Sequence, residues 1–511
     1  MSALLERLIE ASVKESAEKP AAAGEYALIM VRGSGWMVAM RWAVRCIGLV
    51  STIILARLLT PTDFGLVAKA MLVVGMLEIL AETGQRLALI RHPQPTRAHY
   101  DTAWTIGIIV NAALALGMFF VAPVAGSIFH EPAAVPLVRI LALRTLLNGF
   151  ENIGTVDFRR DMDYGKDFHF NVLTKILSFA VTISLALYFR NYIALIGGIV
   201  LGQLILVAVS YGVSSYRPRL SLATAGEIWG YSIWVLISQT GSYALTRLDQ
   251  WVLSARVSNS LMGQYSVGSE LAQLPTSEII TPAARALYPV YCRLWGTSLV
   301  EMTRALITNL RFIAMACAST GVGIACVAHD FALVVLGQQW SETSQFIAYI
   351  ALASALSGFN ASAVVVLNIT GHVRSAGILA WTRVAIAVPC ILLGFKLNGP
   401  LGVAQSLLVA DIIFTPSMYF QVMKAVPISL GTLIGIVWRP LLASGVMAIA
   451  LQFHPFAQVA SPVFRLLLEI AIGACCFTLT LLALWVAAGR PEGGEKVAIE
   501  QLRKMCSRAN P

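Results

Sequence analysis

The chain has 511 residues, of which 57% are hydrophobic and only 13% are charged. Soluble proteins carry about a quarter charged residues, so this composition and a mean hydropathy of +0.74 exclude a soluble globular class and indicate a polytopic membrane protein. The formal charge of +10 fits basic cytoplasmic loops, and we expect no nucleic acid partner because no basic cluster is interleaved with aromatic residues. The eight cysteines form no CxxC pair and no metal-ligand spacing, so we expect no metal and no cofactor.

Residues 1–35 contain both acids and bases without an apolar core. They therefore predict a cytosolic amphipathic segment and not a signal peptide. Fourteen apolar runs of about 20 residues follow, each long enough to cross about 30 Å of hydrocarbon. They lie at about 36–57, 64–84, 103–125, 133–153, 168–189, 191–212, 229–253, 261–283, 306–328, 344–368, 375–395, 401–423, 430–452 and 464–488. We predict an all-α protein with about fourteen transmembrane helices, of which the fourth, seventh and eighth are the most polar.

Basic residues in the loops predict the orientation of these spans. If the N-terminus is inside, the outer loops hold only Arg57, Arg190, Arg256, Lys396 and Arg465, and the other loop lysines and arginines fall inside. This distribution follows the positive-inside rule and predicts that both termini are cytoplasmic. The outer connections are too short to hold a catalytic domain. We therefore expect activity within the bilayer, and not an enzyme.

A weak internal repeat suggests two parallel halves. Residues 56–68 read ARLLTPTDFGLVA and residues 255–268 read ARVSNSLMGQYSVG, and one gap aligns them. Parallel repeats of this kind are typical of transporters that alternate access around a central site. The predicted division is a segment 1–35, an N-lobe 36–212, a cytosolic inter-lobe loop 213–228, a C-lobe 229–424, an extra helix pair 425–488 and a basic cytosolic tail 489–511.

Several stretches resemble one family of bacterial membrane proteins. They are ARLLTPTDFGLVA, LDQWVLSARVSNSLMGQYSVG (248–268), ELAQLPTSEIITPAARALYPVYCRL (270–294), FRRDMDYGKDF (158–168) and NITGHVRS (368–375). Together they resemble the lipid-linked oligosaccharide flippases, the polysaccharide-transporter branch of the multidrug/oligosaccharidyl-lipid/polysaccharide exporter superfamily.

The resemblance implies fourteen helices in two pseudo-symmetric lobes around a cationic cavity. It also implies a flippase of the bacterial inner membrane, which moves polyprenyl-diphosphate-linked oligosaccharides to the outer leaflet for O-antigen, capsule or exopolysaccharide synthesis. The expected partners are this glycolipid, membrane lipid, a coupling ion (H⁺ or Na⁺) and polysaccharide polymerase and export machinery.

Two arginines lie inside the first predicted span. Arg41 and Arg45 are four residues apart and share a helix face, roughly 8 Å and 14 Å from its start at Trp36. A guanidinium binds phosphate oxygens bidentately and stays charged, so we predict that both bind the diphosphate. The alternatives are that Arg41 reaches the inner interface, or that Arg45 pairs permanently with Glu78 or Glu82.

Other charged groups in the spans complete the predicted site. Arg247 and Asp249 are two residues apart, about 200° around a helix, so each needs a partner elsewhere. Arg247 and Arg383 are predicted diphosphate contacts, while Asp249 and Glu78 are candidates for ion coupling. A permanent salt bridge is the alternative for Asp249.

Two other functions fit the sequence less well. A multidrug cation extruder of the same superfamily should favour acids where this chain has arginines. A membrane-embedded polysaccharide polymerase or ligase should have a large outer loop. The paired aspartates of DMD (161–163) can hold a metal in nucleotide-sugar transferases, but no Rossmann-like segment lies near them.

Overall fold

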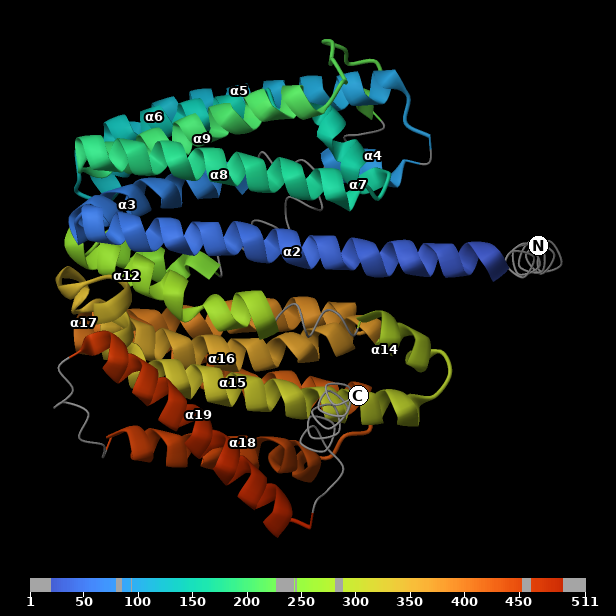
Figure 1. Ribbon diagram of the computed structural model, residues 1–511, viewed down its shortest axis with the longest axis vertical. Helices are drawn as coiled ribbons and strands as arrows, with labels where there is room; N and C mark the ends of the chain where they lie inside the picture. Colours follow the sequence, from blue (N-terminus) through green and yellow to red (C-terminus); the bar gives the residue numbers. More distant parts are fainter. Residues whose placement is uncertain are drawn as a thin grey trace, which may run out of the picture. The chain divides into compact units, whose positions relative to one another are not determined.

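The computed structural model describes residues 20–79, 85–92, 94–226, 243, 246–280, 288–452 and 461–489 (Figure 1). Within these ranges every regular element is a helix. Contacts divide the chain into two compact units: unit 1 comprises residues 1–59 and 73–244, and unit 2 comprises residues 60–72 and 245–511. The predicted lobe boundaries remain predictions.

Unit 1 is a bundle of long helices with short connecting turns. It contains α2 (Pro20–Leu58), the end of α3 (Pro61–Glu78), α4 (Gln85–Arg91), α5 (Arg97–Ile128), α6 (Ala134–Gly149), η2 (Ile153–Val156), α7 (Asp157–Arg160), α8 (Tyr164–Phe189) and α9 (Tyr192–Val213). α5 packs on α6, α6 on α9, α8 on α9, and α2 along α8. Capping residues begin several of these helices, as at Asp163, whose side chain accepts a hydrogen bond from Lys166 N.

Unit 2 holds the remaining helices. They are the start of α3, a helical stretch over 246–254, α12 (Asn259–Ala272), η3 (Thr276–Ile280), α14 (Tyr288–Trp295), α15 (Leu299–Val335), η4 (Gln338–Trp340), α16 (Thr343–Ile369), α17 (Val373–Ala425), α18 (Leu430–Gln452) and α19 (Pro462–Ala487). Its core forms where α15, α16 and α17 meet, around Phe359, Phe414 and Tyr419. α12 packs on α16, and α18 and α19 pack on α15.

The helices agree with most of the predicted spans. Nine helices of the described residues are long and apolar enough to cross a membrane. One of them, α17, is interrupted at Asn398 and at Gly399, which has φ 56°, a conformation that favours glycine. The predicted spans 375–395 and 401–423 fall on its two halves. The all-helical, polytopic class is confirmed. The count of fourteen remains a prediction, because α3, α6 and α12 are shorter and most of 229–253 lies outside the described residues.

Two glycines of the predicted repeat lie close together within unit 2. Gly65 of α3 and Gly263 of α12 lie where these helices touch backbone to backbone. A Cβ on Gly65 would lie 1.6 Å from Asn259 O, and one on Gly263 would lie 1.9 Å from Pro61 O. Only glycine allows this approach, since a real Cβ cannot come so close to a carbonyl oxygen.

Gly263→Ala should therefore destabilise the protein, by about 2–3 kcal/mol, because the two backbones must separate. Thermal unfolding of the detergent-purified protein measures this effect. Gly435→Ala is the matched control, since Gly435 is also helical and faces open space. Equal unfolding temperatures for the two variants would show that the crossing tolerates a methyl group.

Candidate functional site

The two arginines predicted to bind a diphosphate lie on α2. Arg41 is exposed and Arg45 is half-buried, and α2 lies along α8. Near the start of this contact the Trp36 ring meets Phe168 edge-on, with ring centroids 5.0 Å apart. Few residues of the candidate span Gly35–Leu58 are buried, so this helix presents most of its surface, including Arg41, outside the protein core.

A third cation, which the sequence analysis missed, lies on α8 against the same part of α2. Lys175 of α8 approaches α2 so closely that its Cε would be 3.9 Å from a Cβ on Gly48. Gly48 is three residues after Arg45 and shares its face of α2. Lys175 thus lies about one helical turn from Arg45, eleven residues into α8. The position of Lys175 inside the apolar predicted span 168–189 could have identified it as a candidate site residue, because charged residues within the membrane are rare and often functional.

Glu78 has a partner on another helix of unit 1. Arg144 Nη1 of α6 donates to both carboxylate oxygens of Glu78, at 2.5 and 2.6 Å. The Thr145 hydroxyl donates to Glu78 Oε1 at 3.1 Å. Glu78 therefore pairs with α6 and not with the arginines of α2, while Glu82 lies outside the described residues. A role for Glu78 in ion coupling remains a prediction.

Asp249 and Arg247 take separate partners in unit 2, as their spacing requires. Asp249 is buried, with 6% of its surface exposed, and the Tyr265 hydroxyl donates to its Oδ2 at 2.6 Å. Arg247 is exposed, and its Nη1 donates to Gln250 Oε1 at 3.2 Å. Arg247 is thus accessible to a ligand, whereas Asp249 is a carboxyl group enclosed by protein and held by a phenol.

Arg383 forms an ion pair between two helices. Its Nε donates to Asp411 Oδ1 at 2.8 Å and its Nη2 to Asp411 Oδ2 at 3.0 Å. Nη2 also donates to Ser357 Oγ at 3.0 Å. This bidentate geometry is the one a phosphate would use, so a diphosphate must compete with Asp411 for Arg383.

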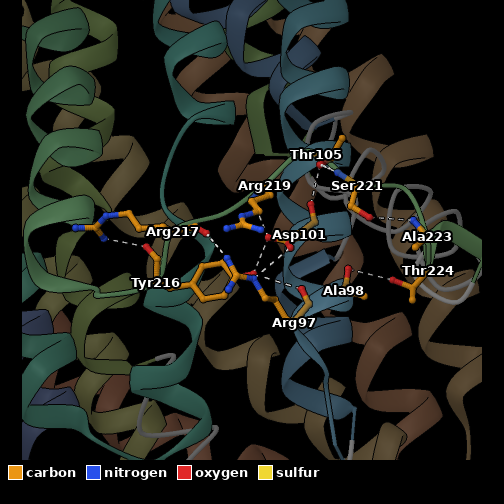
Figure 2. A network of polar contacts seen from close by, with 10 residues as sticks. All are labelled: Arg97, Ala98, Asp101, Thr105, Tyr216, Arg217, Arg219, Ser221, Ala223 and Thr224. Carbon is orange, nitrogen blue, oxygen red and sulfur yellow. Dashed lines mark hydrogen bonds and ion pairs between the residues drawn. The ribbon is translucent and has the colours of Figure 1, made fainter.

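The start of the predicted inter-lobe loop forms a polar network that the sequence did not reveal (Figure 2). The segment after α9 runs along the first turns of α5. Asp101 of α5 accepts hydrogen bonds from the Tyr216 hydroxyl at 2.7 Å and from Arg219 N at 2.8 Å. Further along, Ser221 N donates to Thr105 Oγ1 at 2.9 Å. Burial, helped by the hydrogen bond to Asp101, raises the pKa of Tyr216 above its ordinary value.

Asp101→Ala should release this segment from α5, because the buried carboxylate is the acceptor for two of its groups. The expected loss is about 2–3 kcal/mol. Trypsin cleavage after Arg219 should then become at least tenfold faster. Asp163→Ala is the control: Asp163 binds Lys166 at the start of α8, so its loss should leave cleavage after Arg219 unchanged. Unchanged cleavage in Asp101→Ala would contradict the role of Asp101 as the anchor.

One of the two aspartates of DMD (161–163) has a structural role. Asp163 caps α8 and pairs with Lys166 Nζ at 2.9 Å. This hydrogen bonding from Lys166 lowers the pKa of Asp163. The group therefore acts as a helix cap.

Comparison with known proteins now identifies the family. The family described as polysaccharide biosynthesis protein matches residues 54–345. The chain belongs to this family. One relative is the succinoglycan biosynthesis transport protein ExoT of Rhizobium meliloti, 23% identical over 89% of this chain and 92% of that protein. Another is the lipopolysaccharide biosynthesis protein WzxC of Escherichia coli, 20% identical over 78% of this chain and 81% of that protein.

Solved structures with the same fold are transporters. The lipid II flippase MurJ, in an inward closed conformation, matches with a TM-score of 0.71 at 13% identity, over 88% of this chain and 99% of that one. An inward-facing multidrug resistance MATE family transporter of the MOP superfamily matches with a TM-score of 0.58 at 15% identity, over 74% and 94% of the two chains. The polysaccharide-transporter resemblance and the transporter fold are thus confirmed. These comparisons group the chain with membrane transporters and not with enzymes.

Proposed function

We propose that the protein is a flippase that moves polyprenyl-diphosphate-linked oligosaccharides from the inner to the outer leaflet of a bacterial inner membrane. The observation that carries this proposal is the near full-length similarity to a protein named for transport in succinoglycan biosynthesis. The fold it shares with a lipid II flippase supports the same class of cargo. O-antigen, capsule or exopolysaccharide synthesis would use such a product.

The proposed mechanism is alternating access through a cationic cavity. Arg41 and Arg45 of α2, with Lys175 of α8, would bind the diphosphate in unit 1, and the exposed Arg247 is a separate candidate contact in unit 2. Arg383 would contribute only when Asp411 releases it. A coupling ion, H⁺ or Na⁺, would act at Asp249 or Glu78. Both termini would be cytoplasmic, and polymerase and export machinery would take up the product.

A multidrug cation extruder is the competing transporter function. Its site would need carboxylates accessible to a cationic drug. In the described residues Glu78 is held by Arg144, Asp411 by Arg383 and Asp249 by Tyr265. These three carboxylates are therefore not available to a cationic drug, which supports an anionic cargo.

Deletion of the gene in its own bacterium tests the proposal. The lipid-linked oligosaccharide should accumulate in the inner leaflet, protected from a membrane-impermeant periodate or lectin probe in intact spheroplasts. The intact gene should restore outward labelling. Accumulation in the outer leaflet would instead indicate a polymerase or ligase, and normal export would refute the flippase assignment.

A further inference from the structure

Among the described residues of unit 1, Arg139 has neither a carboxylate partner nor a buried position to account for its place in the predicted span 133–153. Arg139 lies on α6, five residues after its start at Ala134 and hence roughly 8 Å along the helix. It is exposed. The side chains around it on α5 and α6 are exposed and apolar: Phe120 is 70% accessible, and Leu116, Ile140 and Leu143 also face outward.

The contacts of Arg139 differ from those of its neighbour Arg144. Arg144 is bound through both carboxylate oxygens of Glu78. Arg139 instead lies over the Phe119 ring of α5, with its Cζ 4.6 Å from the ring centroid. Among the described residues no carboxylate lies within ion-pairing distance of Arg139, and none accepts a hydrogen bond from it. α5 and α6 pack directly together (Figure 1), which places this cation on an apolar face shared by both helices.

An anion would stabilise a guanidinium in this position. Exposing it to hydrocarbon is unfavourable, and a ring beneath it offsets only part of that cost. The ring contact uses none of its five N–H donors, which match the oxygens of a phosphate bidentately. In the predicted orientation α6 begins at the outer surface. The depth of Arg139 along α6 and the N–H donors of its guanidinium therefore suit the phosphate of a lipid in the outer leaflet.

We infer that Arg139 and Phe119 form a binding site for a lipid phosphate in the outer half of the bilayer. Two lipids carry this chemistry: a resident anionic phospholipid, and the diphosphate-linked cargo on its way out. Only the second rests on the proposed function. In that case the cations of α2 and α8 would hold the diphosphate at the start of its path, and Arg139 would hold it before release.

Native mass spectrometry of the detergent-purified full-length protein can test this site. The probes are phosphatidylglycerol and undecaprenyl diphosphate, with diacylglycerol as an uncharged control. Arg139→Gln should weaken binding of at least one phosphate probe by about tenfold or more, and Phe119→Leu should weaken it less. Diacylglycerol binding should not change. The matched control is Arg256→Gln, because Arg256 also lies over a ring, that of Phe395, but donates to Val252 O.

The outcomes separate the two lipids. If Arg139→Gln loses binding of phosphatidylglycerol alone, the site belongs to a resident lipid. If it loses binding of undecaprenyl diphosphate, the site belongs to the cargo. Unchanged affinity for both probes in Arg139→Gln and in Phe119→Leu, with a wild-type unfolding temperature, would overturn the inference. If the wild type binds the probes through Arg139 but moves no glycolipid in vesicles, the proposed function fails while this site stands.

Discussion

Arg45→Ala is expected to slow glycolipid translocation by about ten- to a hundredfold. The reason is that a charge-assisted, bidentate contact with a phosphate contributes about 1.5–3 kcal/mol. Arg45 is half-buried on α2, with Lys175 about one turn away. The measurement is the initial rate at which a labelled undecaprenyl-diphosphate oligosaccharide changes leaflet in reconstituted vesicles.

Matched variants separate loss of the ligand contact from loss of the fold. Arg45→Lys keeps the positive charge but loses the planar guanidinium that binds a phosphate bidentately, so it should retain part of the translocation rate. Arg57→Ala removes an exposed arginine at the other end of the same helix and should transport normally. Unfolding temperatures should stay within a few degrees of wild type in all three. A wild-type rate in Arg45→Ala would remove the basis for a diphosphate site on α2.

The distribution of apolar residues along the sequence predicted the all-helical, membrane-spanning architecture. Apolar runs of about 20 residues located the long helices, since only helices satisfy their own backbone hydrogen bonds in lipid. The gap between the predicted spans 375–395 and 401–423 falls where α17 breaks at Asn398 and Gly399. These signals are local, and a single sequence contains them.

Pairing between helices was not predictable in the same way. The sequence analysis predicted Arg383 as a diphosphate contact and did not find its carboxylate partner, Asp411, which lies 28 residues away on the other half of α17. The partner of Glu78 was sought on the preceding helix but is Arg144 of α6. The network around Asp101 joins irregular backbone to a helix across more than a hundred residues. The spacing of residues along a helix or strand does not predict such contacts, because they depend on how distant segments pack in the folded protein.

The pair of Arg383 and Asp411 leads to the second large expected effect, on stability. Asp411→Ala should destabilise the protein by about 3 kcal/mol, because it leaves a guanidinium without its partner inside the bundle. This loss of unfolding free energy is at the lower end of the range for breaking a buried ion pair, because 29% of the Arg383 side chain is exposed. Thermal unfolding in detergent measures the loss, and Asn368→Ala, at an exposed position of α16, serves as control.

A double variant then distinguishes structure from transport. Arg383→Met with Asp411→Leu replaces the ion pair by apolar side chains, which is often neutral or stabilising, so the unfolding temperature should recover. If glycolipid transport recovers with it, the pair is structural and Arg383 does not hold the diphosphate. If folding recovers while transport stays at least tenfold below the wild-type rate, the two charges act in the transport cycle and not only in folding, as expected if Arg383 leaves Asp411 to bind the cargo. Failure of the double variant to regain stability would mean that hydrogen bonding to Ser357, and not the ion pair alone, fixes this helix contact.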